Sequence, residues 1–314
     1  MSLSLELQRY LEIRRNLGFD LGTAERVLKQ FVCFLETKNE THITSELFLQ
    51  WKQVFGKAAQ YTWAARLGMV RIFASWLHSF DVHHEIPPQS LIPCHYRRKQ
   101  PYIYTDDQIR SIIEAAGVLP SINGFRALTY PAFFGLVSVT GLRISEAISL
   151  NNKDVDLQDG IITLYNGKNG KDRILPVTEC TKKYLKEYSR KRDRLLGQTP
   201  EPFFVSDEGI RLTDCAVRYN FVVIGKMIGL RAHQRFYKHG IGPRIHDLRH
   251  TFAVKVMINW YKEGKNIDQE MLKLVTYLGH KSMTHTYWYI EAVPELLALA
   301  SQRAEDCLEK EVQS

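Results

Sequence analysis

The segment His246-Asp-Leu-Arg249-His250 is the most informative part of this chain. If it is helical, His246 and Arg249 lie three residues apart on one face, while Leu248 and Phe252 turn toward a core. A forked guanidinium beside an imidazole that can carry a proton is a suitable pair for a phosphate. The segment therefore predicts a helix with one apolar face and one anion-binding face.

The same segment approximates the zinc-protease motif H-E-x-x-H, because two histidines at i and i+4 enclose an acidic residue. Asp247 is shorter than the Glu that would act as the base, and Arg249 would set a cation beside the metal. No obvious third ligand pattern follows in the sequence. We therefore favour the anion site and keep zinc as the less favoured alternative.

Three further segments contain residues of the same chemical types. Thr140-Gly-Leu-Arg143-Ile-Ser-Glu146 contains a cation, and Leu278-Gly-His280 is followed by Thr286-Tyr-Trp-Tyr289. Gly167-Lys168-Asn-Gly-Lys171 lies between two β-branched runs, and its Asn-Gly pair is a strong hairpin signal. Each segment alone is weak evidence, because surface cations, structural histidines and core aromatics are common.

The composition excludes disordered and collagen-like proteins. The chain has 314 residues, of which 45% are hydrophobic and 24% charged, as in ordinary soluble globular proteins. This length predicts about two domains. Lys and Arg number 42 against 34 Asp and Glu, and the resulting net charge of +8 modestly favours an anionic partner.

Cysteine usage and apolar runs indicate the cellular compartment. The five cysteines are odd in number and contain no C-x-x-C pair, which argues against a disulfide framework and a structural zinc site. We therefore expect a reducing, cytoplasmic location. The N-terminus lacks a signal-peptide pattern, and the longest apolar run, residues 132–141, is too short to span a bilayer, so we expect no membrane partner.

The periodicity along the chain divides it into three parts. Residues 1–86 have apolar residues at helical spacing and predict a small helical domain. Residues 87–101 have four prolines, the cations Arg97, Arg98 and Lys99, and no periodicity, which predicts a linker. This linker either follows one side of a duplex or is an ordinary connector. Residues 102–314 are mainly helical with one β insertion. The expected fold class is thus mainly α with a small β-sheet.

Taken together, the four segments resemble the tyrosine recombinase family, the phage-integrase-like site-specific recombinases, whose pattern is R…K…H-x-x-R…[HW]…Y. The resemblance covers most of the chain, since that family has a helical core-binding domain, a linker and a mostly helical catalytic domain. His280 precedes Tyr289 by nine residues, the family's usual distance to the nucleophile. The chain starts almost at the first core-binding helix, so we expect a simple two-domain member. The run after Thr286 is similar to that of transposon-associated recombinases.

The resemblance implies six catalytic positions, with Glu146 as a supporting acid: Arg143, Lys168, His246, Arg249, His280 and Tyr289. Lys171 is an alternative to Lys168. Tyr287 is close to Tyr289, but two residues differ by about 200° on a helix, so both cannot face the same phosphate. The spacing from His280 selects Tyr289.

The resemblance also implies a mechanism without metal or cofactor. Arg143 and Arg249 would clamp the non-bridging oxygens and stabilise the charge that builds at phosphorus. Lys168 would protonate the departing 5′ oxygen, His246 would handle the proton of the nucleophile, and His280 would hydrogen-bond the phosphate. A 3′-phosphotyrosyl link would conserve the bond energy for rejoining.

The function expected from this resemblance is site-specific recombination for integration, excision or transposition of a mobile element. The partners would be double-stranded DNA and, on two paired sites, three further copies of the chain, which would be monomeric or weakly associated in solution. The tail after Pro294 would either dock on a neighbouring copy or pack on its own domain. DNA contacts are expected at Arg97, Arg98, Lys99, Arg231, Arg235 and Arg244. The alternatives are a type IB topoisomerase and a catalytically silent DNA-binding regulator.

Overall fold

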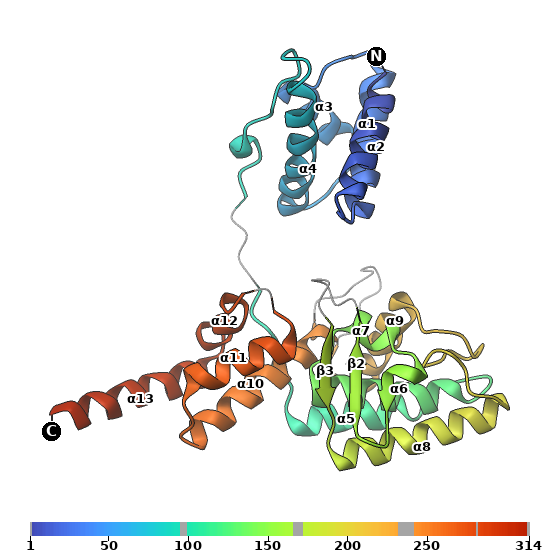
Figure 1. Cartoon of the computed structure of the whole chain (residues 1–314), viewed down its shortest axis with the longest axis vertical. Helices are drawn as coiled ribbons and strands as arrows, with labels where there is room; N and C mark the ends of the chain where they lie inside the picture. Colours follow the sequence, from blue (N-terminus) through green and yellow to red (C-terminus); the bar gives the residue numbers. More distant parts are fainter. Residues whose placement is uncertain (1, 95–98, 166–171, 232–241, 281, 313–314) are drawn as a thin grey trace. The chain divides into compact units, whose positions relative to one another are not determined.

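The computed structural model describes residues 2–94, 99–165, 172–231, 242–280 and 282–312, with side chains up to residue 305. It divides into two compact units, residues 1–99 and 100–314, and each is described by itself (Figure 1). The predicted fold class, mainly α with a small β-sheet, is confirmed. Over the described ranges, no helix has both the length and the apolar character needed to cross a bilayer.

The first unit is a helical bundle around an aromatic core. The apolar stripes expected from the 3.6-residue spacing meet at Phe31, Trp51 and Trp63, all of which are buried. The rings of Trp51 and Trp63 lie 5.2 Å apart and nearly perpendicular, an edge-to-face contact. The bundle consists of α1 (Leu3–Asn16), α2 (Gly22–Thr37), α3 (Ser45–Val54) and α4 (Gln60–His78).

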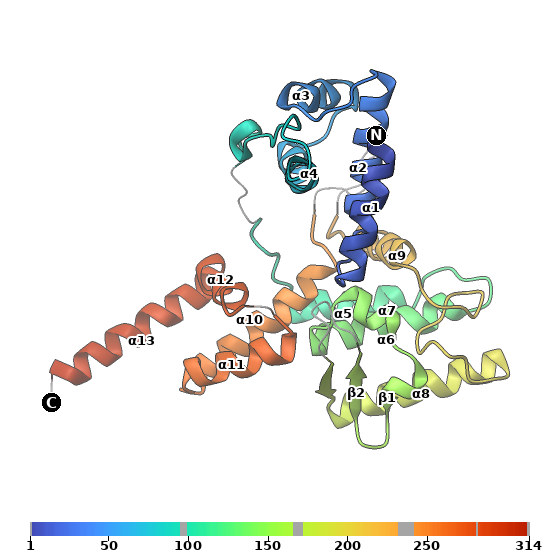
Figure 2. The same ribbon diagram turned by 45° about the horizontal axis from the view of Figure 1, so that its top comes forward.

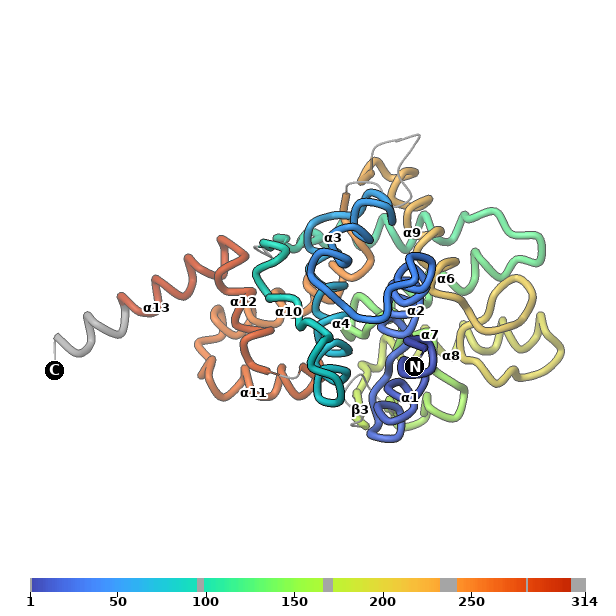
Figure 3. Tube along the Cα trace, turned by 90° about the horizontal axis from the view of Figure 1, so that it is seen from above, coloured from blue at the N-terminus to red at the C-terminus, as the bar shows by residue number. Residues whose placement is uncertain are grey.

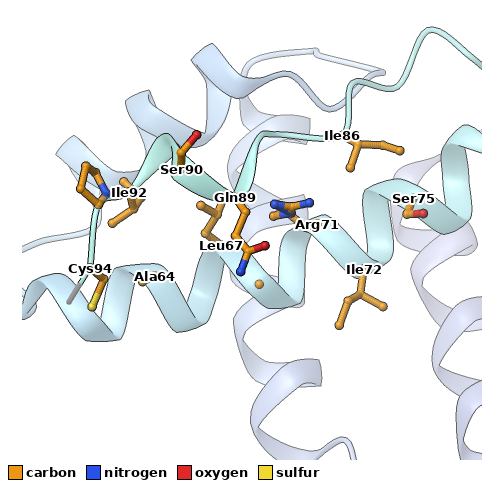
Figure 4. A pocket seen from close by; sticks show the side chains of 12 residues that line it. Ala64, Leu67, Arg71, Ile72, Ser75, Ile86, Gln89, Ser90, Ile92 and Cys94 are labelled. Atoms are coloured by element: carbon orange, nitrogen blue, oxygen red, sulfur yellow. The ribbon is translucent and has the colours of Figure 1, made fainter. Parts of the chain in front are cut away.

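Part of the proline-rich segment 87–101 packs on this bundle. A 3₁₀ turn, η1 (Gln89–Leu91), is followed by Ile92, which is buried in the aromatic core, and the Gln60 side chain donates to the Pro93 carbonyl (2.9 Å). A groove of about 910 Å³ runs between this segment and α4 (Figure 4). Its lining is mainly apolar or small, with Arg71 as its charged member. Residues 89–93 of the predicted linker thus belong to the surface of the first unit.

The second unit combines helices with a three-stranded antiparallel sheet. The strands β1 (Val155–Asp156), β2 (Ile161–Leu164) and β3 (Arg173–Pro176) are ordered β1-β2-β3, with Ile162 paired to Leu175 (Figure 2). The Asn-Gly signal lies between β2 and β3. The sheet follows a 3₁₀ turn, η2 (Asn152–Asp154), and the helices of this unit are α5 (Asp106–Ala116), α6 (Phe125–Thr140), α7 (Ile144–Ser149), α8 (Glu179–Leu196), α9 (Asp214–Met227), α10 (His246–Lys262), α11 (Ile267–Leu278), α12 (Thr284–Ala292) and α13 (Pro294–Val312).

The apolar helix α6 lies at the centre of the second unit and packs against α5, α8 and α10. Its Phe133 is fully buried and meets Phe204 edge-to-face, with ring centroids 5.2 Å apart. A second apolar cluster joins α10, α11, α12 and the start of α13, and it includes Met271, Tyr289 and Leu296. These two clusters fix the ends of α6, α10 and α11 relative to one another.

Helix α13 contacts its own unit along its first half, up to Arg303. Leu296 is fully buried in the cluster with Tyr289, whereas Leu297 is 50% exposed. The Arg303 guanidinium donates to the Lys265 carbonyl (2.6 Å). Beyond its contacts with α10 and α12, the helix extends away from the rest of the second unit (Figures 1 and 3).

Candidate active site

A glycine turn between α6 and α7 positions Arg143. Gly141 ends α6 with a φ of +64°, and a Cβ at this position would come within 2.6 Å of the Phe252 ring, so the turn requires glycine. Leu142 is buried, and Arg143 becomes the N-cap residue of α7. The segment 140–146 therefore directs one half-buried guanidinium toward the start of α10 and the end of α11.

The carboxylate of Glu146 joins two of the site's cations. Glu146 is only 8% exposed, and its oxygens pair with Arg143 Nη1 (2.6 Å) and with Arg173 Nη2 (2.7 Å) from β3. The backbone N–H of Arg143 also donates to it (2.8 Å). Burial alone would raise the pKa of Glu146, but these hydrogen bonds and the charge of Arg173 hold it below its ordinary value. Glu146 is therefore ionised at neutral pH and fixes both guanidiniums.

Arg249 connects three chain segments from the interior of the unit. Its guanidinium is only 2% exposed and donates to the carbonyls of Gly141 (2.7 Å) and Leu278 (2.5 Å). Arg143 Nη2 donates to the next carbonyl in the chain, that of Gly279 (2.9 Å). Since two arginines bind consecutive carbonyls, the turns after α6 and α11 and the first turn of α10 meet at one place.

Positive charge exceeds negative charge in this cluster. Burial and the neighbouring Arg143 lower the pKa of Arg249 to about 9, which still leaves it mostly charged at neutral pH. Arg143, Arg173 and Arg249 face the single negative charge of Glu146 among the described residues around them, because Asp247 pairs with Arg244 (2.9 Å). Such an excess of buried positive charge favours a negatively charged ligand.

Three histidines surround the arginines, and all of them are neutral at pH 7. The pKa of His246 is lowered to about 4 by partial desolvation and by Arg249, although the residue is exposed. Burial, with His246 next to it, lowers the pKa of His250 to about 3. Burial and Arg249 also lower the pKa of His280 to about 3. A neutral imidazole can accept a proton, so each ring is a potential base.

Tyr289 projects from α12 toward these histidines. Its side chain is 2% exposed, and its hydroxyl lies 2.5 Å from His250 Nδ1. When His250 carries its proton on Nε2, the phenol O–H donates to Nδ1. The rings of His246 and His250 lie 4.7 Å apart and nearly perpendicular. The other tyrosine of this helix, Tyr287, turns away and donates to Asp268 (3.3 Å).

Comparison with known proteins assigns the chain to a family. Residues 103–295 match the profile of the phage integrase family. An integrase/recombinase of Sinorhizobium fredii, y4rB, is 38% identical over 95% of this chain and 96% of its own length. The tyrosine recombinase XerC of Thermodesulfovibrio yellowstonii is 31% identical over 76% of this chain and 73% of its own length. This chain belongs to the phage integrase family.

The solved structures give the same fold. The XerH site-specific recombinase, in a post-cleavage complex with its palindromic difH substrate, has a TM-score of 0.64 and 21% identity, covering 95% of this chain and 84% of that one. The predictions of a tyrosine recombinase fold and of a tyrosine-type site-specific recombinase are confirmed.

Four of the six predicted catalytic residues of this recombinase lie together. They are linked either by shared hydrogen-bond partners or by being neighbours in the chain. Arg143 and Arg249 bind consecutive carbonyls, His246 is on the same helical turn as Arg249, and His280 follows Gly279 directly. His280 Nδ1 lies 2.7 Å from the Thr286 hydroxyl, which orients the ring. Tyr289 joins this group through a residue outside the predicted set, His250. Lys168 and its alternative Lys171 lie outside the described residues.

Two of the predicted DNA contacts are engaged with the recombinase's own chain. Arg231 donates through Nε to the Pro243 carbonyl (2.9 Å), and Arg244 pairs with Asp247 at the start of α10. Both therefore hold the segment that leads into α10. Lys99 is exposed, whereas Arg97, Arg98 and Arg235 lie outside the described residues.

Sequence reasoning missed the roles of His250 and Arg173. The sequence indicates His250 only through its i, i+4 spacing from His246, which we compared with a zinc-protease motif and did not favour. In the structure, His250 Nδ1 has the Tyr289 hydroxyl as its partner. Arg173 follows the hairpin in sequence, and its pairing with Glu146 depends on the register of β3. No local signal in the sequence reports either contact.

Replacing Glu146 should destabilise this recombinase strongly. Glu146→Ala leaves Arg143 and Arg173 without their carboxylate in a nearly buried position, which costs about 3 kcal/mol of unfolding free energy. The matched control Glu187→Ala removes an exposed carboxylate that pairs with Lys191 on α8 and should leave stability nearly unchanged. Urea denaturation measures both variants, and equal effects would contradict a structural role for the Glu146 pairs.

Proposed function

We propose that this recombinase cuts and rejoins double-stranded DNA with Tyr289 as the nucleophile, forming a 3′-phosphotyrosyl intermediate. The observation that carries the proposal is the contact between the Tyr289 hydroxyl and His250, on the helical turn that also bears Arg249. A phenol with an ordinary pKa near 10 is a poor nucleophile at neutral pH. Both a base and a positive field are therefore needed, and both lie beside Tyr289.

The arginines are suited to bind the scissile phosphate. Arg143 and Arg249 would hold its non-bridging oxygens, and the charge surplus around Glu146 would stabilise the additional negative charge of the transition state. Loss of one such preorganised donor typically costs about 10² to 10³ in rate. His280, oriented by Thr286, would donate to the same phosphate.

The proton of Tyr289 would pass to His250, its immediate hydrogen-bond partner. Its low pKa, about 3, belongs to a cluster crowded with cations, and a bound phosphate would raise it because an opposite charge favours the imidazolium. His246, whose ring lies against that of His250, would support the orientation of this base. Lys168, or Lys171 in its place, would protonate the 5′ oxygen.

Substitution of Tyr289 should separate covalent chemistry from binding. Tyr289→Phe removes only the nucleophilic oxygen, so covalent attachment to a nicked DNA substrate should disappear while DNA affinity stays nearly constant. Tyr287→Phe is the matched control and should remain active, because Tyr287 contacts Asp268 instead. Denaturing gel electrophoresis detects the covalent adduct. An inactive Tyr287→Phe with an active Tyr289→Phe would refute the assignment, and the absence of any adduct with the unaltered chain would favour a regulator without catalysis.

Substitution of His250 should slow cleavage and change its pH dependence. His250→Gln keeps a polar side chain but cannot accept the proton, so we expect a loss of about 10² to 10⁴ in the cleavage rate at pH 7. The remaining rate should rise with pH, because hydroxide from solvent then takes the place of the missing base. The comparison variant is His246→Gln, whose effect should be smaller. A larger loss in His246→Gln, with His250→Gln near normal, would assign the base to His246.

The wider role proposed is integration, excision or transposition of a mobile element by a tetramer on two paired DNA sites. The name integrase/recombinase of the Sinorhizobium fredii relative supports integration, and the exposed residues of α13, such as Leu297, support assembly of several copies. The cysteines of the described residues, Cys33, Cys94, Cys180 and Cys215, are free thiols, which supports a cytoplasmic location. Tyr289 and Leu296 share one apolar cluster, so docking of α13 on a neighbouring copy would affect the position of the nucleophile.

Shortening α13 tests this coupling without disturbing the core. Deletion of residues 304–314 retains Leu296 and the contact of Arg303 with Lys265. The truncated chain should bind a single DNA site with unchanged affinity, while recombination between two sites should fall at least tenfold. Gel-shift titration and product analysis measure the two quantities. Full recombination by the truncated chain would contradict an assembly role for α13 and would favour a monomeric, topoisomerase-like action.

A further inference from the structure

A second cluster of polar side chains lies in the first unit, on the two loops that follow α2 and α4. His42 comes from the α2–α3 loop, and Asp81 and His83 follow the end of α4. One ring nitrogen of His42, a carboxylate oxygen of Asp81 and one ring nitrogen of His83 all lie within 4.8 Å of one another. Each of these atoms can be a metal ligand. None of the three residues belongs to the recombination site described above.

The spacing between the possible ligand atoms of this cluster is close to the spacing around a bound metal ion. Asp81 stands between the two imidazoles, with Oδ2 3.0 Å from His42 Nε2 and Oδ1 2.7 Å from His83 Nδ1. An ion with ligand bonds near 2.0–2.1 Å in tetrahedral arrangement separates its ligand atoms by roughly 3.3 Å. The two contacts of Asp81 are thus a few tenths of an ångström shorter than the ligand spacing around such an ion, and all three ligand atoms, within 4.8 Å of one another, are near enough to share it.

The backbone holds the two loops together independently of these side chains. The Glu85 N–H donates to the Ile43 carbonyl (2.8 Å), and the Ile43 N–H donates to His84 Nδ1 (3.2 Å). Ile43 and His84 are buried, and the Glu85 carboxylate accepts from the Ser45 N–H (2.7 Å). Because the loops are already joined, a metal would meet preorganised ligands, which is the arrangement that gives affinity.

Neighbouring groups orient the ligands. His42 Nδ1 lies 2.9 Å from the Thr41 hydroxyl, so a proton on Nδ1 can be donated to Thr41 while Nε2 keeps its lone pair for a metal. The Asp81 carboxylate also accepts from the backbone N–H of His83 (3.0 Å). His83 is largely exposed, which leaves room for a water molecule to complete the coordination. His84 is not one of the three residues, and its Nδ1 accepts from the Ile43 N–H.

We propose that His42, Asp81 and His83 bind one divalent transition-metal ion, with Zn²⁺ as the best match. Two imidazole nitrogens and one carboxylate suit zinc and its neighbours, whereas Mg²⁺ and Ca²⁺ prefer oxygen ligands throughout. The ion joins the α2–α3 loop to the end of α4 and so stabilises the first unit. This site is independent of the function proposed for Tyr289.

Metal titration of the full chain tests the proposal. After treatment with EDTA, calorimetric titration with ZnCl₂ should give one saturable site, and Co²⁺ should give the visible absorption of a low-symmetry nitrogen–oxygen site. His42→Gln, His83→Gln and their double variant should weaken Zn²⁺ binding by at least tenfold. Zn²⁺ should also raise the unfolding temperature of the unaltered chain and not that of the double variant. The control His250→Gln should bind Zn²⁺ normally, since it disrupts only the histidine pair of α10.

Circular dichroism verifies that each variant is folded. If the ligand variants do not fold, Thr41→Val removes only the partner of His42 and should weaken Zn²⁺ binding by about 10- to 100-fold. The absence of saturable binding to the unaltered chain would overturn the proposal. So would binding that persists in the double variant, or binding that is lost in His250→Gln, because the ion would then lie at α10.

Discussion

The second unit depends on the buried guanidinium of Arg249. It donates to the carbonyls that end α6 and α11, at Gly141 and Leu278, and thereby satisfies backbone groups that a helix leaves unpaired at its C-terminus. An unpaired cation at this depth would be costly, so the three segments must meet for the unit to be stable. Through this one side chain, the glycine turns after α6 and α11 bring Arg143 and His280 to the same place.

The chemical character of the site follows from its charges. Three guanidiniums and one carboxylate leave a surplus of positive charge, while burial and that surplus keep the nearby histidines neutral. A phosphodiester suits both the positive charge and the neutral histidines. It is an anion, and its negative charge favours protonation of a neighbouring histidine. The groove on α4 has a different character, with apolar and small residues around Arg71, and it lies in the first unit (Figure 4). The cation cluster is therefore the better match to a phosphate.

The position of the nucleophile is tied to the end of the chain by apolar packing. Tyr289 and Leu296 are buried in the same cluster, and α13 keeps contact with the unit up to Arg303 before it extends away (Figure 3). A force applied to the exposed part of α13 is thus transmitted to the helix that carries the phenol. This arrangement gives the proposed dependence of cleavage on assembly a physical basis, because packed cores shift as units.

The sequence by itself determined the helices, the β-hairpin and the glycine turn before Arg143, because these depend on neighbours a few residues apart. Periodicity, caps and glycine turns act within that distance. The choice of Tyr289 over Tyr287 rests on its spacing from His280 in the family resemblance and stays a prediction. Only the tertiary structure decided the contacts of His250 with Tyr289, of Arg173 with Glu146, and of His42 with Asp81. Their partners are 39, 27 and 39 residues apart in the chain. Such pairs depend on strand register and on how helices pack, which no local pattern records.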